Sequence, residues 1–305
     1  MASRRRIKKT MLNIVRKRKI FYGFSLALIA AGIFSVIFWG LRFGIDFKGG
    51  SLLEVEYVGA RPEVQAIHDR LAPLDLGGVN IQLTGPTGLF LRLKDVNEET
   101  HQKVLAELAN LGELEEKRFE SIGPVIGQEL KKKAYGAILM VLLLIVIYIT
   151  WVFRKVSRPV ASWQYGVAAV IALFHDVFIP VGIFSILGHY LGAEIDLLFV
   201  TGILTILGFS VHDTIVVFDR IRENLRQSGS KSFEETVNAS INQTLGRSIN
   251  TSLTVLLTLL AIYVFGGETT KYFSLLLMLG IFFGTYSSIF VASSLLVSWH
   301  SGKNN

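Results

Sequence analysis

The chain has 305 residues, of which 51% are hydrophobic and 18% are charged, and its mean hydropathy is +0.48. This composition excludes an ordinary soluble domain and indicates a polytopic membrane protein with one modest soluble part. The net charge is +7, but many of the basic residues crowd into 4–19, directly before an apolar segment. Such a cluster sets membrane orientation and contacts anionic headgroups, so we expect contact with the lipid bilayer and no nucleic-acid partner. There is no cysteine, which excludes disulfides and thiolate metal sites.

Six apolar segments are each near or above the roughly 20 residues that cross a bilayer. We predict membrane spans at 20–41, 134–153, 161–188, 195–218, 248–265 and 271–298. The first follows a basic region as a signal peptide would, but it is too long for the apolar core of a signal peptide. It is therefore predicted to be a retained span.

Lys and Arg are distributed unevenly among the connections between these spans. With the basic tail 1–19 inside, the short connections after the second and fourth spans also lie inside, and both are rich in Lys and Arg. The short connections on the other side hold a single basic residue, Lys271. The positive-inside rule therefore predicts that both termini, including the tail 299–305, are cytoplasmic. The expected location of this multi-pass protein is the cell (inner or plasma) membrane.

One connection is long, and the predicted topology places it outside the cytoplasm at 42–133. Strand patterns occur at 51–58, 79–84, 89–93 and 116–121, and helical patterns occur at 62–71 and 97–110. The order β-α-β-β-α-β is that of a small ferredoxin-like α+β domain. This extracytoplasmic domain carries no catalytic signature, so we expect it to bind a partner.

The segment 232–245 is predicted to be an amphipathic cytoplasmic helix between the fourth and fifth spans. Ser232 followed by Glu235 is a capping box. Its apolar face consists of Phe233, Val237, Ile241 and Leu245. We expect this helix to lie along the membrane surface or to pack under the bundle.

Asp213 lies inside the fourth predicted span, in the stretch GFSVHDTIVVFDRIREN at 208–224. A carboxylate at such a depth costs about 3 kcal/mol on insertion scales, and intramembrane carboxylates usually mark pathways or relays. We therefore predict a protonatable site that faces the bundle interior. The alternative is a structural Asp that is held neutral by a hydroxyl or backbone partner.

Two further ionisable residues accompany Asp213 at membrane depth. Arg247 opens the fifth span at a comparable depth, so the two groups are expected to meet across helices; the alternative is an ordinary Arg that snorkels at a helix end. Desolvation favours the protonated carboxyl and a guanidinium favours the ionised one, so such a pair suits proton uptake and release. Asp176, near the middle of the third span, joins the predicted proton pathway because of its depth and charge.

His175 and His212 neighbour the two carboxylates, and we expect them to be core or pore-lining residues rather than metal ligands. The sequence contains none of the motifs GxxxxGK[ST], HExxH and GxSxG. We therefore expect no enzymatic activity, no cofactor and no metal. Gly280 and Gly284 in the sixth span are followed by several Ser residues, a pattern typical of close helix packing.

The motif FGIDFKGG at 43–50, directly after the first span, resembles the signature of the SecF branch of the SecD/SecF protein-export family. The stretches HDTIVVFDRIREN at Asp213, NQTLGRSINTS around Arg247 and SIGPVIG at 121–127 are similar to other motifs of that family. The SecD branch has a GLDLxGG-type motif and a much larger outer region, so this chain resembles SecF. The motif residues are Gly44, Asp46, Phe47, Gly49 and Gly50, whereas Lys48 stands where a small residue is more usual.

This resemblance, which runs from about residue 20 to 298, implies a six-helix RND-type bundle with SecD as an obligate partner. It implies that the pair assists the SecYEG channel and SecA, and uses the proton gradient to promote late stages of preprotein export, with a translocating polypeptide as cargo. In the family, the residues matching Asp213 and Arg247 belong to the proton path. Two other functions compete: an RND-like exporter of small hydrophobic molecules, which would need about twice as many spans, and a scaffold in which Asp213 is structural.

Overall fold

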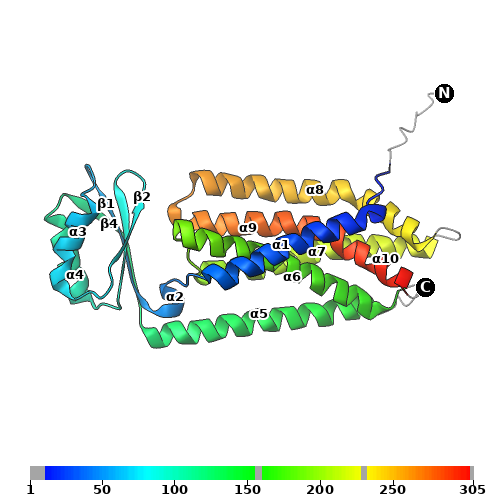
Figure 1. Ribbon diagram of the computed structural model, residues 1–305, viewed down its shortest axis with the longest axis horizontal. Helices are drawn as coiled ribbons and strands as arrows, with labels where there is room; N and C mark the ends of the chain where they lie inside the picture. Colours follow the sequence, from blue (N-terminus) through cyan, green and yellow to red (C-terminus); the bar gives the residue numbers. More distant parts are fainter. Residues whose placement is uncertain (1–10, 155–159, 228–231, 303–305) are drawn as a thin grey trace, which may run out of the picture. The chain divides into compact units, whose positions relative to one another are not determined.

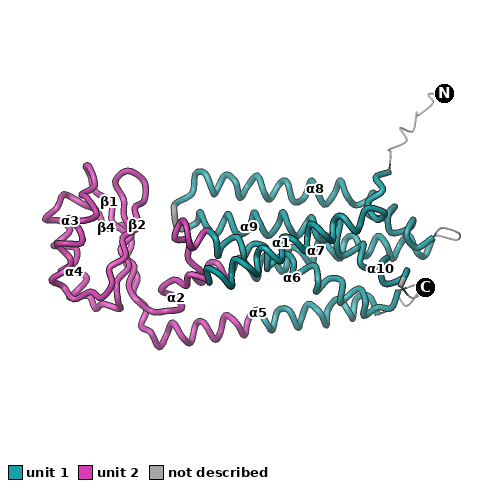
Figure 2. Tube along the Cα trace, viewed as in Figure 1, with its two compact units in different colours: residues 1–40, 138–186, 201–305 teal, residues 41–137, 187–200 magenta. Residues whose placement is uncertain are grey.

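The computed structural model describes residues 11–154, 160–227 and 232–302. The basic residues at 4–9, 155, 158 and 231 and the tail end 303–305, all used in the topology prediction, lie outside the described residues. The chain divides into two compact units (Figure 2), residues 1–40, 138–186 and 201–305 in the first and residues 41–137 and 187–200 in the second.

Long helices dominate the chain (Figure 1), and the predicted number of six helices able to span a membrane is confirmed among the described residues. The first span consists of a 3-10 turn, η1 (Val15–Lys17), and α1 (Arg18–Trp39), and the last consists of α9 (Glu268–Ser287), a π-helical turn (Ser288–Ala292) and α10 (Ser293–Gly302). The other four spans are α5 (Pro124–Val152), α6 (Ser162–Leu191), α7 (Leu197–Gln227) and α8 (Phe233–Phe265).

The spans differ strongly in how far they are buried within the chain. In the last span 61% of the apolar stretch is buried, in α6 56% and in α7 50%, against 17% in α1 and α8 and 6% in α5. The centre of the bundle is therefore built from α6, α7 and α9. The exposed apolar faces of α1, α5 and α8 are available to lipid or to a partner subunit.

Glycines permit close approach of helices in the bundle, as the small-residue pattern of the last span predicted for Gly280. A Cβ atom on Gly280 of α9 would lie 2.2 Å from the Cδ1 atom of Ile206 on α7. A Cβ atom on Gly182 of α6 would lie 2.3 Å from the Cα atom of Gly32 on α1. Both contacts bring helix backbones closer than any side chain would allow.

The amphipathic segment 232–245 is not a separate helix, which corrects the sequence interpretation. It forms the first part of α8, which runs without interruption to Phe265. The segment before the apolar stretch holds no proline, and the single Gly246 costs only about 1 kcal/mol relative to alanine. The predicted capping box is present, since the Glu235 amide donates to Ser232 Oγ at 3.2 Å and the Ser232 amide donates to Glu235 Oε2 at 3.1 Å. The apolar residues Phe233, Val237 and Ile241 are buried, so this face packs against protein.

The second unit contains a four-stranded antiparallel sheet in the order β2-β3-β1-β4, with α3 and α4 on one side of it (Figure 1). The strands are β1 (Gly50–Tyr57), β2 (Asn80–Thr84), β3 (Gly88–Leu93) and β4 (Leu114–Ile122). The helices are α2 (Ile45–Lys48), α3 (Val64–Leu71), the 3-10 turn η2 (Ala72–Leu74) and α4 (Glu98–Ala109). The predicted βαββαβ order is confirmed.

Period-two alternation explains how this sheet covers its core. Leu53 and Val55 of β1 are fully buried, and Leu53 pairs with Leu91 of β3 on one side and Phe119 of β4 on the other. The intervening residues point to the other face of the sheet. Asn97 begins α4 as predicted, because its Oδ1 atom accepts a hydrogen bond from the Thr100 amide at 3.0 Å.

Candidate functional site

Asp213 is buried between three helices of the bundle, with only 2% of the residue exposed. Thr285 of α9 donates from Oγ1 to Asp213 Oδ2 at 3.2 Å. The Oγ atom of Ser252, from α8, hydrogen-bonds to the same Thr285 hydroxyl. A carboxyl group on α7 is thus joined to α9 directly and to α8 through one hydroxyl.

Both hydroxyls have an alternative acceptor on their own helix. Thr285 Oγ1 also lies 2.9 Å from the carbonyl oxygen of Ile281, and Ser252 Oγ lies 2.9 Å from that of Ser248. A hydroxyl carries one hydrogen and two acceptor positions. Thr285 can therefore donate to an ionised Asp213, or accept from a protonated Asp213 while donating to Ile281.

Arg247 does not form the expected ion pair with Asp213 among the described residues. Its side chain is exposed on α8, five residues before Ser252, or about 7.5 Å along the helix axis. The side chain of the neighbouring His212 is exposed as well. The structure thus replaces the expected direct contact with a hydroxyl contact, and His212 is exposed rather than a core residue of this chain.

Asp176 of α6 is fully buried in a second polar cluster. Its Oδ2 atom accepts hydrogen bonds from Ser210 Oγ on α7 and, at 2.8 Å, from Ser287 Oγ on α9. Its Oδ1 atom lies 2.8 Å from His175 Nδ1. The other ring nitrogen of His175 is buried with no hydrogen-bond partner among the described residues. His175 is a core residue, as expected.

The start of the π-helical turn connects the two polar clusters. Ser288, its first residue, hydrogen-bonds through Oγ to Thr214 Oγ1 at 2.8 Å and lies 3.4 Å from the Ser210 carbonyl. Thr285 lies three residues before Ser288 and Ser287 directly precedes it, so this region of the last span contacts both carboxylates. A π turn inserts an extra residue in a helix and is frequent at functional sites.

The sequence interpretation missed these hydroxyl donors, because it assigned the serines of the last span to helix packing. The signal that could have identified them is the density of hydroxyl residues opposite two intramembrane carboxylates. Buried carboxylates require hydrogen-bond donors. Among the described residues the hydroxyl donors are Ser210, Thr285 and Ser287, and Ser252 supports Thr285.

A polar strip is exposed on the outer faces of α7 and α8. Its members recur every three or four residues and therefore share a face of each helix. On α7 the exposed positions are Thr201, Thr205, Gly208 and His212, and on α8 they are Gln243, Arg247, Asn250, Thr254 and Thr258. Polar groups at membrane depth are costly against lipid, so this strip is suited to face water or another subunit.

The motif at 44–50 forms α2 and the turn into β1, and it packs against the connection between α6 and α7. The Gly44 amide donates to the Ile195 carbonyl at 2.9 Å, and the Ile195 amide donates to the Arg42 carbonyl at 2.8 Å. Asp46 Oδ2 accepts from the Leu197 amide at 2.7 Å. The motif therefore fixes the start of α7 within the second unit.

Gly49 is required by its surroundings in this motif. Its φ angle is +79°, and a Cβ atom would lie 2.7 Å from the Cα atom of Pro124. Gly50 follows with φ +126°, in a region that side chains rarely adopt. Phe47 is buried at 5% exposure, whereas Lys48 is exposed, which explains why a long side chain is tolerated there.

Asp196 begins α7 in the same connection, and its Oδ1 atom accepts from the Phe199 amide at 2.7 Å. Burial raises the pKa of Asp196, and the charges of Asp46 and Glu194 raise it further, against the opposing effect of the Phe199 hydrogen bond. Glu194 itself pairs with Arg92 at 2.9 Å. Across the part of the chain that the structure describes, no group of three or more His, Asp or Glu is placed to hold a metal ion.

Comparison with known proteins identifies the family. Residues 101–302 match the model described as protein export membrane protein SecD/SecF, C-terminal, and residues 34–60 match the SecD/SecF GG motif. The chain belongs to the SecD/SecF family. The resemblance of the motifs is thereby confirmed, and the family's role in protein export excludes a small-molecule exporter as the best explanation of the fold.

Several SecD/SecF relatives match over almost their whole length. The chain is 46% identical over 305 residues to the protein translocase subunit SecF of Thermobaculum terrenum, covering 95% of each chain. It is 44% identical to that of Anaerolinea thermophila, covering 96% of each. The crystal structure of SecDF, a translocon-associated membrane protein from Thermus thermophilus, matches 97% of this chain with a TM-score of 0.82 and 33% identity. This chain spans 39% of that SecDF chain.

Proposed function

We propose that this chain is an accessory subunit of the Sec protein translocase that works with SecD and uses the proton gradient to promote late stages of preprotein export. Family membership supports the role in export. The observation that carries the proton-driven part is the buried Asp213 with its reversible hydroxyl partner. The SecYEG channel, SecA and the translocating polypeptide complete the proposed set of partners.

The proposed orientation places both termini in the cytoplasm and residues 42–133 outside the cell membrane. Six spans put the two ends of the chain on the same side, and the basic residues that precede α1 favour the cytoplasmic side. The domain boundaries proposed from the sequence follow from this orientation. The ferredoxin-like domain then faces the compartment into which preproteins emerge, where it is available to a polypeptide.

In the proposed cycle Asp213 carries the proton. When the carboxyl is ionised, Thr285 donates to it and Ser252 supports Thr285. When a proton arrives, Asp213 becomes the donor, Thr285 turns to the Ile281 carbonyl and Ser252 turns to that of Ser248. No buried hydrogen-bonding group is left without a partner in either state, so the exchange avoids the cost of about 1–3 kcal/mol for each unsatisfied group.

Arg247 is proposed to set the balance between these states. Its side chain is exposed on α8 and is not held by an ion pair to any described carboxylate. Movement of the guanidinium toward Asp213 would favour the ionised form, and movement away would favour the protonated form. Coupling requires that the proton binds two conformations unequally, and displacement of Arg247 supplies that difference.

Asp176 is proposed as a second proton-binding position in the same pathway. It is fully buried, and His175, Ser210 and Ser287 surround it. Its cluster lies one helical turn from Asp213 along α7, since Ser210 and Asp213 are three residues apart. The proposal assigns no catalytic residue, cofactor or metal to the chain.

SecD is the proposed occupant of the polar strip on α7 and α8. The SecDF chain that superposes on this one is much longer, which supports a partner that supplies the remainder. A partner seated on the strip would remove Arg247 and His212 from lipid. The strip would then line a polar path between the two subunits.

Export into inverted membrane vesicles, with and without an uncoupler, tests the proposal. Asp213→Asn retains the shape of the protonated carboxyl and should remove the uncoupler-sensitive part of export while SecD still co-purifies. Asp219→Asn is the matched control, because Asp219 lies on the same helix but is exposed and pairs with Arg222 at 2.6 Å. Uncoupler-sensitive export that persists in Asp213→Asn would overturn the proposed function.

A further inference from the structure

A basic cavity of about 390 Å³ lies where the first span begins. It is lined by Asn13, Arg16, Lys17, Lys19 and Ile20. All three cations are exposed, and no carboxylate among the described residues pairs with any of them. We propose that this cavity binds the phosphate group of an anionic glycerophospholipid, in the leaflet where α1 starts.

The backbone that presents these cations is fixed by two asparagines of α8. Asn238 Oδ1 accepts from the amides of Ile14 and Val15 at 3.0 and 3.3 Å. Asn242, one turn later, both accepts from the Leu12 amide and donates to the Leu12 carbonyl, each at 2.9 Å. Ile14 and Val15 are buried at 4% and 1% exposure. We refer to these hydrogen bonds from Asn238 and Asn242 to residues 12–15 as the clamp. A basic tail that only set membrane orientation would not need it.

Arg18, in the same segment, is a cation with a structural role. It is half-buried, donates to the Val15 carbonyl at 3.1 Å and pairs with Glu234 at 3.3 Å. Arg16, Lys17 and Lys19 on either side of it make no such contact within the described chain. Arg18 is therefore engaged within the chain, whereas the other three cations remain available to a ligand.

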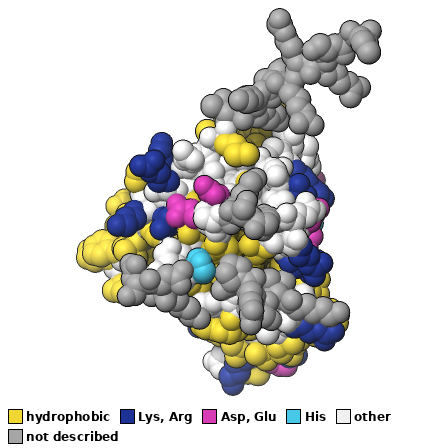
Figure 3. Space-filling model, turned by 90° about the vertical axis from the view of Figure 1, so that its right-hand side faces the viewer, with side chains coloured by type: hydrophobic (Ala, Val, Ile, Leu, Met, Phe, Trp, Pro, Cys, Tyr) yellow, Lys and Arg dark blue, Asp and Glu magenta, His cyan; other side chains and the backbone are white. Residues whose placement is uncertain are grey.

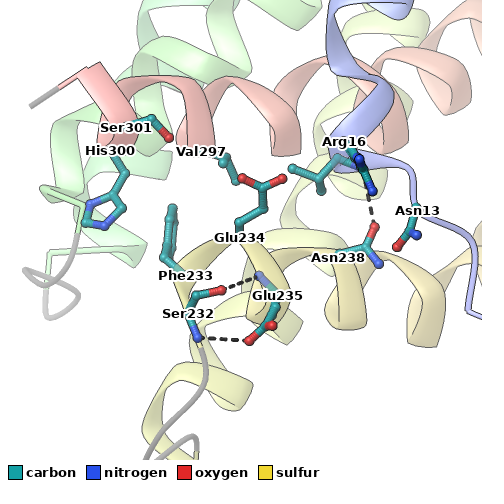
Figure 4. A pocket seen from close by; sticks show the side chains of 11 residues that line it. Asn13, Arg16, Ser232, Phe233, Glu234, Glu235, Asn238, Val297, His300 and Ser301 are labelled. Atoms are coloured by element: carbon teal, nitrogen blue, oxygen red, sulfur yellow. Dashed lines mark hydrogen bonds between the residues drawn. The ribbon is translucent and has the colours of Figure 1, made fainter. Parts of the chain in front are cut away.

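A neighbouring cavity of about 500 Å³ shares Asn13 and Arg16 with this one and has a mixed polar and apolar lining. Figure 4 shows Asn13 and Arg16 at one side of it, beside Asn238 of α8. Its two carboxylates are already engaged, Glu234 with Arg18 and Glu235 with the Ser232 amide. The unneutralised positive charge therefore lies on the α1 side. Figure 3, which faces this end of the bundle, shows further Lys and Arg side chains around its rim.

The chemistry of the lining favours a lipid phosphate over a soluble anion. A guanidinium binds phosphate oxygens in a bidentate manner, and lysines add point charges. The same side of α1 continues with Ile20 and Phe24, which are 68% and 52% exposed and lie one turn apart. A phosphate in the cavity with acyl chains along these two side chains would satisfy both the charged and the apolar surfaces. This inference does not rest on the proposed proton cycle.

Native mass spectrometry of the full chain in detergent, titrated with phosphatidylglycerol, tests the site. Arg16→Gln/Lys17→Gln/Lys19→Gln should weaken binding roughly 100-fold, since each cation near an anionic lipid contributes about a factor of five. Lys131→Gln/Lys132→Gln/Lys133→Gln, with the same loss of charge on α5, should bind as the unaltered chain does. Phosphatidylcholine should bind more weakly than phosphatidylglycerol.

A variant that lacks the clamp distinguishes a structured binding site from nonspecific electrostatic attraction. Asn238→Ala/Asn242→Ala keeps every charge but releases the backbone, and it should weaken binding about tenfold or more. Asn242→Ala alone serves if the double variant does not fold, and should weaken binding to a lesser degree. Equal weakening by the α5 variant, or unchanged binding by a folded clamp variant, would overturn the proposal. Inorganic phosphate that displaces the lipid at equal concentration would also overturn it, because the site would then be one for a free anion.

Discussion

Thr285 Oγ1 lies 3.2 Å from Oδ2 of Asp213 and 2.9 Å from the carbonyl oxygen of Ile281, one turn earlier on its own helix. The hydroxyl has one hydrogen for these two acceptors. The protonation state of Asp213 therefore decides which of them it serves. Protonation of Asp213 on α7 therefore changes the hydrogen bond made by Thr285 on α9. In this way a proton can alter the packing of the two helices.

Thr285→Val tests this relationship, because valine preserves the shape of the side chain and removes the hydroxyl. A hydrogen bond to a charged group contributes about 1.5–3 kcal/mol, so we expect proton-driven export to fall roughly tenfold or more. Export into vesicles with a proton gradient is the measurement, and co-purification of SecD shows that assembly is intact. Thr150→Val, at an exposed position of α5 outside the polar strip, is the control. Full export by Thr285→Val would show that the hydroxyl has no part in the cycle.

Asp176 is expected to serve both stability and proton movement, and two variants separate these roles. Asp176→Leu leaves Ser210 Oγ and His175 Nδ1 without their partner, whereas Ser287 Oγ keeps the Gly284 carbonyl at 3.1 Å. Each unsatisfied group costs about 1–3 kcal/mol. We expect a clear loss of thermal stability in detergent. Asp176→Asn keeps an acceptor oxygen and should remain close to the unaltered chain in stability while its export is reduced. If Asp176→Asn exports fully, Asp176 carries no proton; if Asp176→Leu is as stable as the unaltered chain, the cluster is not structural.

The sequence was sufficient for much of this architecture because the relevant signals are local. Apolar length predicted the six spans, and alternation and turn residues predicted the βαββαβ order. The depth of Asp213 and Asp176 could be predicted for the same reason, and both are buried. Their partners could not, because hydroxyl contacts from other helices depend on helix rotation and crossing, which no local pattern encodes. The uninterrupted α8 was missed because an amphipathic stretch followed by an apolar one does not by itself show whether the helix breaks between them.

The proposed orientation can be tested with single cysteines, since the natural chain has none. Pro86→Cys, in the exposed turn between β2 and β3, should react with a membrane-impermeant thiol reagent added to intact cells. Gln227→Cys, exposed at the end of α7, should react only after the membrane is permeabilised. The opposite pattern would invert the topology, and labelling of both in intact cells would contradict six spans.

Asp196 predicts a pH dependence of stability in the connection between α6 and α7. Because burial raises the folded-state pKa of Asp196, its contribution to stability is fully present below the unfolded pKa, about 3.9. That contribution is lost as the pH rises through the raised folded pKa. Asp196→Asn retains an acceptor for the Phe199 amide but cannot ionise, so its melting temperature should fall less between pH 4 and neutrality, on the order of a few degrees. Asp75→Asn, an exposed position, is the control. Parallel melting curves for Asp196→Asn and the unaltered chain would contradict the buried, charge-crowded setting of Asp196.

Infrared difference spectroscopy across a pH titration, on the chain co-purified with SecD, measures directly whether Asp213 exchanges a proton. The carbonyl stretch of a protonated carboxyl group should appear as the pH is lowered, should be missing from the spectrum of Asp213→Asn, and should shift in frequency in Thr285→Val because the acceptor of the carboxyl proton is gone. A spectrum of Asp213→Asn identical to that of the unaltered complex would show that Asp213 keeps one protonation state throughout, and the proposed proton cycle would be wrong.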